Sequence, residues 1–188
     1  IKYPSNQSLY LMSKLYAQQE INAYGKSNSV ITIHPTFMIG ALDYGPSSGK
    51  IVLMGMKKII FCPPGGKNFV HVKDVANACI NAIKLNNHEA NYIIGNENLS
   101  YYEFFKLIQK EHNRNSIIIR IPSLVFYPMG LLGNIFRFLG FKTELSLANM
   151  KILMINNYFK NDKSLKELKF KYKPIEEAVK DAVNFFKI

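Results

Sequence analysis

A tyrosine and a lysine four residues apart stand near the start of the sequence and could together move a proton. Tyr10 and Lys14 lie in the stretch SLYLMSKLYAQQ, residues 8–19, whose apolar residues recur at helical spacing. Residues four apart on a helix share a face, so the two side chains can point into one cleft. A phenol has a pKa of about 10, which a neighbouring ammonium group lowers. The pair therefore has the residue types of a general acid/base.

The spacing alone does not establish this chemistry, because the sequence contains the same pair a second time. Tyr102 and Lys106 occur in SYYEFFK, where Ser100 and Glu103 form the capping-box pattern of an ordinary helix. By spacing alone, the simpler interpretation is that Tyr10 and Lys14 merely share a helix face. A catalytic assignment depends on the surrounding sequence.

The elements that would position this pair form an alternating pattern typical of an α/β fold. We expect a helix over residues 8–26, followed by a buried parallel strand at residues 30–35 that ends at a proline. Further short strands are expected at residues 58–61, 69–72, 91–94 and 116–122. Further helices are expected at residues 48–56, 75–85, 101–112, 145–155 and 174–186, with one more near residue 163. These strands are too few for a complete doubly wound sheet, so we expect the missing strands upstream of residue 1.

The net charge of +11 raises the question of a nucleic-acid or anionic-membrane partner. Only three of the 24 basic residues are arginine, which favours a compositional bias over a binding face. The densest basic run, residues 163–173, fits a short amphipathic helix better than a single-strand binding surface. We therefore expect no nucleic-acid partner.

The two cysteines, Cys62 and Cys79, are far apart in the sequence and have no nearby histidines. This pattern indicates neither a disulfide framework nor a metal site, and it favours a reduced, cytoplasmic setting.

An apolar segment at residues 121–141 has nearly the length of a membrane span. Two prolines, three glycines, Asn134 and Arg137 interrupt it. Because lipid disfavours an unpartnered charge, we expect a buried or ligand-facing helix and no membrane partner.

Four later segments, in order along the chain, give the opening pair its context. They are HPTFMIGALDYGPSSG, GGKNFVHVKDVANACINAI, NYIIGNENLSYYEFFKLI and NDKSLKELKFKYKPIEEAVKDAVNFF. Together with YLMSK, they resemble the extended short-chain dehydrogenase/reductase family, in particular its dihydroflavonol-reductase-like branch. The resemblance implies part of a Rossmann-type doubly wound parallel sheet in residues 1–40 and 69–95. It also implies a smaller, mainly helical substrate-binding lobe in residues 41–68 and 96–188. The family's glycine-rich phosphate-binding turn does not occur in the sequence, so the first Rossmann half is expected upstream and the 188 residues alone are expected to bind dinucleotide poorly.

The resemblance also implies roles for individual residues. Tyr10 would be the general acid/base, and Lys14 would hold the cofactor ribose and lower the tyrosine's pKa. The residues implied to line the nicotinamide side or otherwise contact the cofactor are Pro35, Thr36, Phe37, Met38 and Ser47. Asn68, Phe69 and His71 would lie near the substrate cleft or its edge, and a structural role for His71 is an equal alternative.

The function implied is hydride transfer between NAD or NADP and a carbonyl or hydroxyl group of a small-molecule substrate. A sugar-nucleotide epimerase or dehydratase, and a non-catalytic dinucleotide-binding module, remain as alternatives. Members of the family often pair through a helix like residues 8–26, so a homodimer is also implied.

Overall fold

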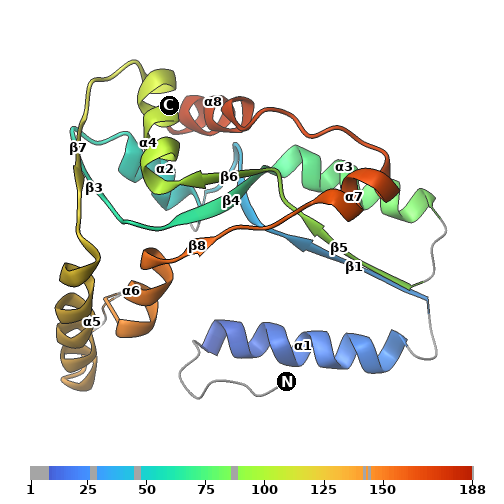
Figure 1. Cartoon of the computed structure of the whole chain (residues 1–188), viewed down its shortest axis with the longest axis horizontal. Coiled ribbons are helices and arrows are strands. Elements are labelled where there is room, and N and C mark those ends of the chain that lie inside the picture. The colour runs from blue at the N-terminus through green and yellow to red at the C-terminus, as the bar shows by residue number, and fades with distance from the viewer. Residues whose placement is uncertain are drawn as a thin grey trace.

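The computed structural model describes residues 9–25, 29–44, 48–85, 89–141, 143 and 145–187. Among these residues the strands form three separate sheets with helices packed on them, which confirms the α/β fold class (Figure 1).

The first sheet is the parallel pair of β1 (Val30–Pro35) and β5 (Glu89–Ile94), in which Pro35 lies opposite Ile94. Helix α3 (Val72–Lys84) and helix α7 (Asp162–Leu168) pack on this pair. Helix α1 (Leu9–Gly25) lies on the other side of it (Figure 1). β1 is rich in β-branched residues, and in β5 the buried Ala90, Tyr92 and Ile94 alternate with the exposed Asn91 and Ile93. The buried side chains of β5 form a core with residues of α3, α7 and β4.

The second sheet is centred on β4 (Gly66–His71). This strand pairs in parallel with β2 (Phe37–Ile39) and β8 (Asn156–Asn157), and antiparallel with β6 (Glu97–Ser100). Three helices surround its main core: α2 (Gly49–Gly55), α4 (Tyr101–His112) and α8 (Ile175–Phe186). Phe69 stacks on Phe104 with ring centroids 4.0 Å apart, so β4 and α4 share the centre of this core.

The third sheet is the parallel pair of β3 (Ile59–Cys62) and β7 (Ile117–Arg120). β7 leads into helix α5 (Ser123–Phe138), which packs against α6 (Leu147–Met154). Gly130 and Gly133 allow this close contact, because a Cβ at Gly130 would lie 2.7 Å from Leu147 Cα and one at Gly133 would collide with Leu145 O.

Residues 121–141 were expected to form a buried or ligand-facing helix, and the buried alternative is wrong for most of α5. Only Phe126, Gly130 and Gly133 are buried in this helix, since they form the single stripe that faces α6. Within the described part of the chain, no helix combines the length and the apolar character that crossing a membrane requires.

Candidate functional site

The carboxyl ends of β1 and β5 lie side by side, and Thr36 joins them. Its backbone N–H donates to Ile94 O at 2.9 Å, and its Oγ1 donates to Asn68 Oδ1 at 2.8 Å. Gly95 follows β5 directly at this point. A Cβ there would lie 2.7 Å from Thr36 Cγ2 and would collide with the Asn68 side chain. Position 95 therefore requires glycine, because a residue with a Cβ could not lie so close to Thr36 and Asn68.

Asn68 extends this junction to a distant part of the chain. Its Nδ2 donates to Asn98 Oδ1 at 2.7 Å and to Phe159 O at 3.4 Å. Asn98 in turn accepts a hydrogen bond from Phe159 N–H and donates one to Phe159 O, both at 3.1 Å. Asn161 Nδ2 donates to Gly95 O at 2.8 Å. We call Thr36, Asn68, Asn98 and Asn161 the asparagine cluster.

Two members of the asparagine cluster, Asn98 and Asn161, were not among the residues singled out from the sequence. Asn98 belongs to the segment GNEN that directly follows β5. A polar segment at the carboxyl end of a parallel strand was the signal that could have found it, because ligands bind at that edge of open α/β sheets. Asn161 comes from a segment distant in the sequence, and no local pattern marks it.

The structure brings together residues to which the sequence assigned different roles. Thr36 was predicted to contact the cofactor and Asn68 the substrate, and the two are hydrogen-bonded. Phe37 was likewise predicted to contact the cofactor and Phe69 to lie near the substrate. Their rings form an edge-to-face contact with centroids 5.6 Å apart. Asn68 is 2% exposed and Phe69 is 0% exposed, so both side chains are used for internal contacts. Their predicted contact with a substrate remains a prediction.

Pro35 and Met38 are the accessible members of the predicted nicotinamide set. Both are exposed, at the carboxyl end of β1 and within the adjacent β2. The N–H and hydroxyl of Thr36 are already used within the protein. A nicotinamide ring is flat and largely apolar, so an exposed proline and methionine at this edge fit it, whereas Thr36 would serve as their support.

The remaining predicted site residues are Tyr10 and Lys14, which belong to α1, and Ser47. Lys14 is exposed on α1. The backbone of Tyr10 belongs to the same helix, but its side chain is outside the described part of the structure, as is the whole of Ser47. The geometry of the Tyr10–Lys14 pair therefore remains a prediction.

Lys67 precedes Asn68 on β4, and its Nζ lies 5.2 Å from the centroid of the Phe37 ring. Burial lowers the pKa of Lys67, because a charged amine is poorly solvated in this position. A cation–π contact of this length partly compensates for that desolvation.

The contacts of His71 favour the structural one of the two roles that the sequence left open. Its buried ring caps α3, with Nδ1 accepting a hydrogen bond from Lys73 N–H at 3.2 Å. Its Nε2 lies 3.4 Å from Asp181 Oδ2 on α8. Burial lowers the pKa of His71, which the nearby Asp181 carboxylate opposes. The neutral ring therefore joins β4, α3 and α8.

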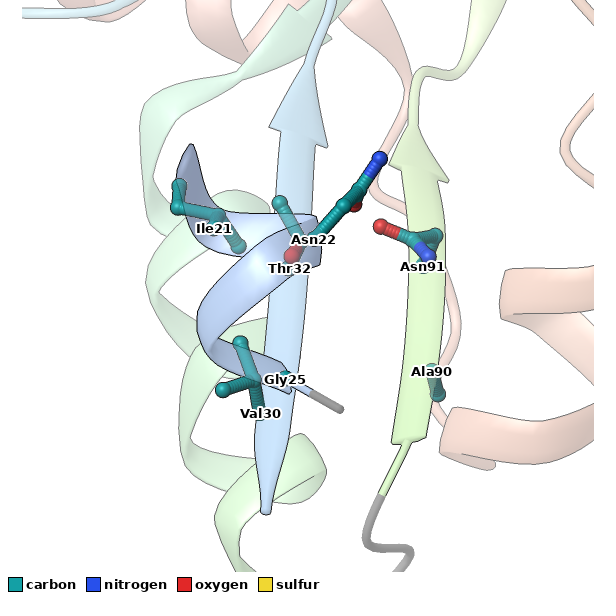
Figure 2. Close-up of a pocket in the computed structure, with 7 residues that line it drawn as sticks. All are labelled: Ile21, Asn22, Gly25, Val30, Thr32, Ala90 and Asn91. Carbon is teal, nitrogen blue, oxygen red and sulfur yellow. The ribbon is translucent and has the colours of Figure 1, made fainter. Parts of the chain in front are cut away.

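A pocket of about 300 Å³ lies between the last turns of α1 and the amino-terminal halves of β1 and β5, and Figure 2 shows the residues around it. The pocket is lined by Ile21, Asn22, Gly25, Val30, Thr32, Ala90 and Asn91. Val30 and Ala90 stand near the amino ends of their strands. Since ligands of open α/β sheets bind at the carboxyl ends, this pocket is not the candidate active site. In the described part of the chain, no group of three or more His, Cys, Asp and Glu residues could hold a metal ion.

The fold of this chain is similar to the folds of several solved structures. The chain matches the crystal structure of gox2253 with a TM-score of 0.79 and 23% identity, over 99% of this chain and 59% of that one. It matches a nucleoside-diphosphate-sugar epimerase from Pseudomonas aeruginosa with a TM-score of 0.73 and 16% identity, over 99% of this chain and 57% of that one. The fold of the chain is that of the later part of these Rossmann-type structures.

A third match is UDP-glucose 4-epimerase from Bifidobacterium longum, solved in complex with NAD+ and UDP. The TM-score is 0.68 and the identity 13%, over 99% of this chain and 56% of that one. The chain thus spans less than three fifths of the length of each of these proteins. No protein-family model and no curated protein matches the sequence. The similarity between this chain and these solved structures is therefore a similarity of fold.

Proposed function

We propose that this chain forms the later part of an NAD(P)-dependent oxidoreductase of the extended short-chain dehydrogenase/reductase type. The observation that carries the proposal is the order of α1, β1 and the asparagine cluster. The helix with the Tyr10–Lys14 spacing leads into a parallel strand, and this strand ends at the exposed Pro35. The likeness in fold to a UDP-glucose 4-epimerase that holds NAD+ supports a nicotinamide cofactor.

In this proposal one set of residues carries out the proton transfer and a second set contacts the nicotinamide. Tyr10 gives a proton to the substrate oxygen, or takes one from it, and Lys14 holds the ribose and lowers the pKa of the phenol. Pro35 and Met38 cover one side of the nicotinamide, whose chemistry is to give or accept a hydride. Thr36 and Asn68 keep this surface in place through their hydrogen bond. The phosphate-binding turn of the cofactor site would come from the part of the fold that these residues do not supply.

The proposed proton transfer is tested by changing Tyr10→Phe in the complete protein. We expect kcat to fall by a factor of about 10² to 10⁴, because the change removes only the hydroxyl that transfers the proton. Cofactor affinity should stay nearly constant. The matched control is Tyr102→Phe, which has the same spacing to a lysine on α4 and should leave kcat unchanged. Retained turnover in Tyr10→Phe would reject the role of this residue.

Two of the structural matches support a second candidate function, because they are sugar-nucleotide epimerases. The substrate would then be a sugar attached to a nucleoside diphosphate. An epimerase regenerates its cofactor in each cycle, whereas a reductase such as the dihydroflavonol-reductase type consumes one equivalent per turnover. Measuring reduced cofactor against product therefore separates the two candidates. Cofactor binding without turnover on any substrate would favour a non-catalytic module.

A further inference from the structure

One end of the molecule exposes an apolar surface that no described element covers. The outward side chains of the β3–β7 pair are Ile59, Phe61, Ile117 and Ile119, all of which are exposed. Ile59 is paired with Ile117 and Phe61 with Ile119, so the four residues form one patch. The inward residues Ile60 and Cys62 are buried in the main core. This parallel pair is thus apolar on both faces, a pattern typical of strands that are covered on both sides.

Helix α5 continues this patch directly after β7. Leu124 is 81% exposed and Phe138 is 91% exposed, and Leu131 and Ile135 between them are also exposed. The helix turns only a narrow stripe toward α6, so most of its circumference is apolar and uncovered. Figure 1 shows β3, β7 and α5 along one end of the molecule. We call Ile59, Phe61, Ile117, Ile119 and the exposed apolar residues of α5 the apolar end face.

The two sequence segments that carry the apolar end face contain basic residues and no acidic ones. No Asp or Glu occurs in residues 44–73 or in residues 112–143, although Glu111 and Glu144 lie directly outside the second segment. All three arginines of the sequence lie in the second segment. Lys57 and Lys58 are exposed directly before β3, and Arg137 is exposed in the last turn of α5. Exposed apolar side chains on segments whose own charges are all basic complement a surface that is apolar inside and anionic outside.

We propose that the apolar end face binds to the surface of a bilayer containing anionic lipids. Helix α5 would lie in the plane of the interface, with its leucine, isoleucine and phenylalanine side chains among the acyl chains and Arg137 at the level of the headgroups. The helix does not need to span the bilayer for this mode of binding. The proposal is independent of the proposed catalytic function, because it uses none of the residues assigned to the cofactor or the substrate.

The location of the apolar end face argues against cover by additional strands of the Rossmann sheet. Such strands would extend the β1–β5 pair at the side of β1 that faces no described strand. Figure 1 places this pair at the other end of the molecule from β3 and β7. A patch of this extent on a protein surface ordinarily marks a site of interaction.

The test is flotation of the complete protein with vesicles of phosphatidylcholine alone and with vesicles that also contain phosphatidylglycerol. We expect binding to the anionic vesicles, weaker binding at high salt, and little binding to the zwitterionic ones. The double change Leu131→Gln and Ile135→Gln should lower the partition coefficient at least tenfold, since burying one such side chain contributes about a factor of ten or more. The change Arg137→Gln should lower it about fivefold.

Helix α3 supplies matched controls. Ile80 and Ile83 are also exposed isoleucines on a helix, and changing both to glutamine should leave vesicle binding unchanged. Lys84→Gln controls for Arg137→Gln, because Lys84 is the basic residue in the last turn of α3.

Three outcomes would overturn the proposal. The first is that the wild-type protein fails to bind anionic vesicles at low salt. The second is that binding survives the Leu131 and Ile135 changes, which would make it a property of net charge alone. The third is a wild-type dimer in sedimentation equilibrium that the same changes convert to a monomer without any vesicle binding, which would show that a second copy covers the face.

Discussion

The asparagine cluster and the apolar end face are placed against solvent in opposite ways. In the cluster, Asn68 is buried, Thr36 and Asn161 are half-buried and Asn98 is exposed, and each amide has hydrogen-bond partners within the protein. At the end face, apolar side chains stand in water without a described neighbour over most of their surface. The amide groups of the first region are hydrogen-bonded within the protein, whereas the second region has the composition of a surface that binds a partner.

This difference matters for how the two regions respond to mutation. The hydrogen bonds of the buried Asn68 contribute to the stability of the fold, and removal of its amide leaves Thr36 Oγ1 and Asn98 Oδ1 without that partner. An exposed apolar side chain contributes little to the stability of the protein that carries it. Stability should therefore depend strongly on one region and binding on the other.

The largest expected effect comes from one substitution made in both settings. Phe69→Ala should lower the free energy of unfolding by about 3–5 kcal/mol, because it leaves a cavity beneath Phe104. Phe138→Ala removes the same atoms from α5 and should change it by less than about 0.5 kcal/mol. Urea unfolding of the complete protein measures both. Similar losses in the two variants would mean that α5 is covered within the protein, which contradicts the comparison.

A smaller effect is expected from Asn68→Ala. Thr36 Oγ1 and Asn98 Oδ1 lose their partner, and we expect a loss of about 1–3 kcal/mol in the free energy of unfolding. The matched control is Asn184→Ala on α8, where the asparagine is exposed and the change should be nearly neutral. If Asn68→Ala is as neutral as this control, water replaces the amide and the asparagine cluster is not closed.

Patterns that are local in the sequence predicted the elements well. The capping box of α4 is present, with Glu103 N–H donating to Ser100 Oγ at 3.2 Å and Ser100 N–H donating to Glu103 Oε2 at 2.7 Å. Asp74 lies in the first turn of α3, where an acidic residue is favoured, and its Oδ2 accepts a hydrogen bond from Lys173 N–H. The basic run at residues 163–173 includes the predicted short helix, α7. Its aromatic residues Phe170 and Tyr172 pack against the core of the β1–β5 pair.

Features that depend on distant partners were not predictable in the same way. The sequence of residues 95–98, GNEN, predicts a turn, but Glu97 begins β6 because it pairs with β4, some thirty residues earlier. The sequence of residues 63–68, PPGGKN, also predicts a turn, yet β4 begins at Gly66, where Leu99 O and Tyr158 Oη leave no space for a Cβ. The glycine- and proline-containing segment 38–49 predicts a loop, but residues 38 and 39 belong to β2, which pairs with β4. A predicted domain boundary between residues 68 and 69 falls within β4.

The candidate site was predictable only in part. The sequence indicated Thr36 and Asn68 separately, but not their hydrogen bond, because it joins strands that are not neighbours in the chain. It also did not indicate the apolar end face. The pattern of residues 121–141 raised only the question of spanning or burial, and the exposure of α5 appears only when α6 is seen to cover a single stripe.

The smallest expected effect is on the pH dependence of the free energy of unfolding. It should arise from the buried His71 and not from the apolar end face. His71 is faced by Asp181, Asp74, Lys73 and Lys173, and burial as the largest influence lowers its pKa below the ordinary value of 6.5. Below about pH 6.5 the unfolded chain therefore binds a proton that the folded protein resists, so the contribution of this histidine to stability is complete above that pH and is lost as the pH falls through the folded pKa. Protonation of Nδ1 would also remove its hydrogen bond from Lys73 N–H.

His71→Asn should keep the helix cap, since asparagine accepts the same backbone hydrogen bond, and should lose the titration. Urea unfolding at pH 7.5 and 5.5 should thus show a smaller loss of stability on acidification in the variant than in the wild type. Part of the slope will remain, because burial lowers the pKa of His112 as well. Residues 113–143 contain no histidine or acid, so vesicle binding by the apolar end face should be equal at both pH values. If the free energy of unfolding depends on pH equally in His71→Asn and in the wild type, the His71 ring at the junction of β4, α3 and α8 is not withdrawn from solvent. That result would contradict the contrast between a solvent-excluded interior and the exposed apolar end face.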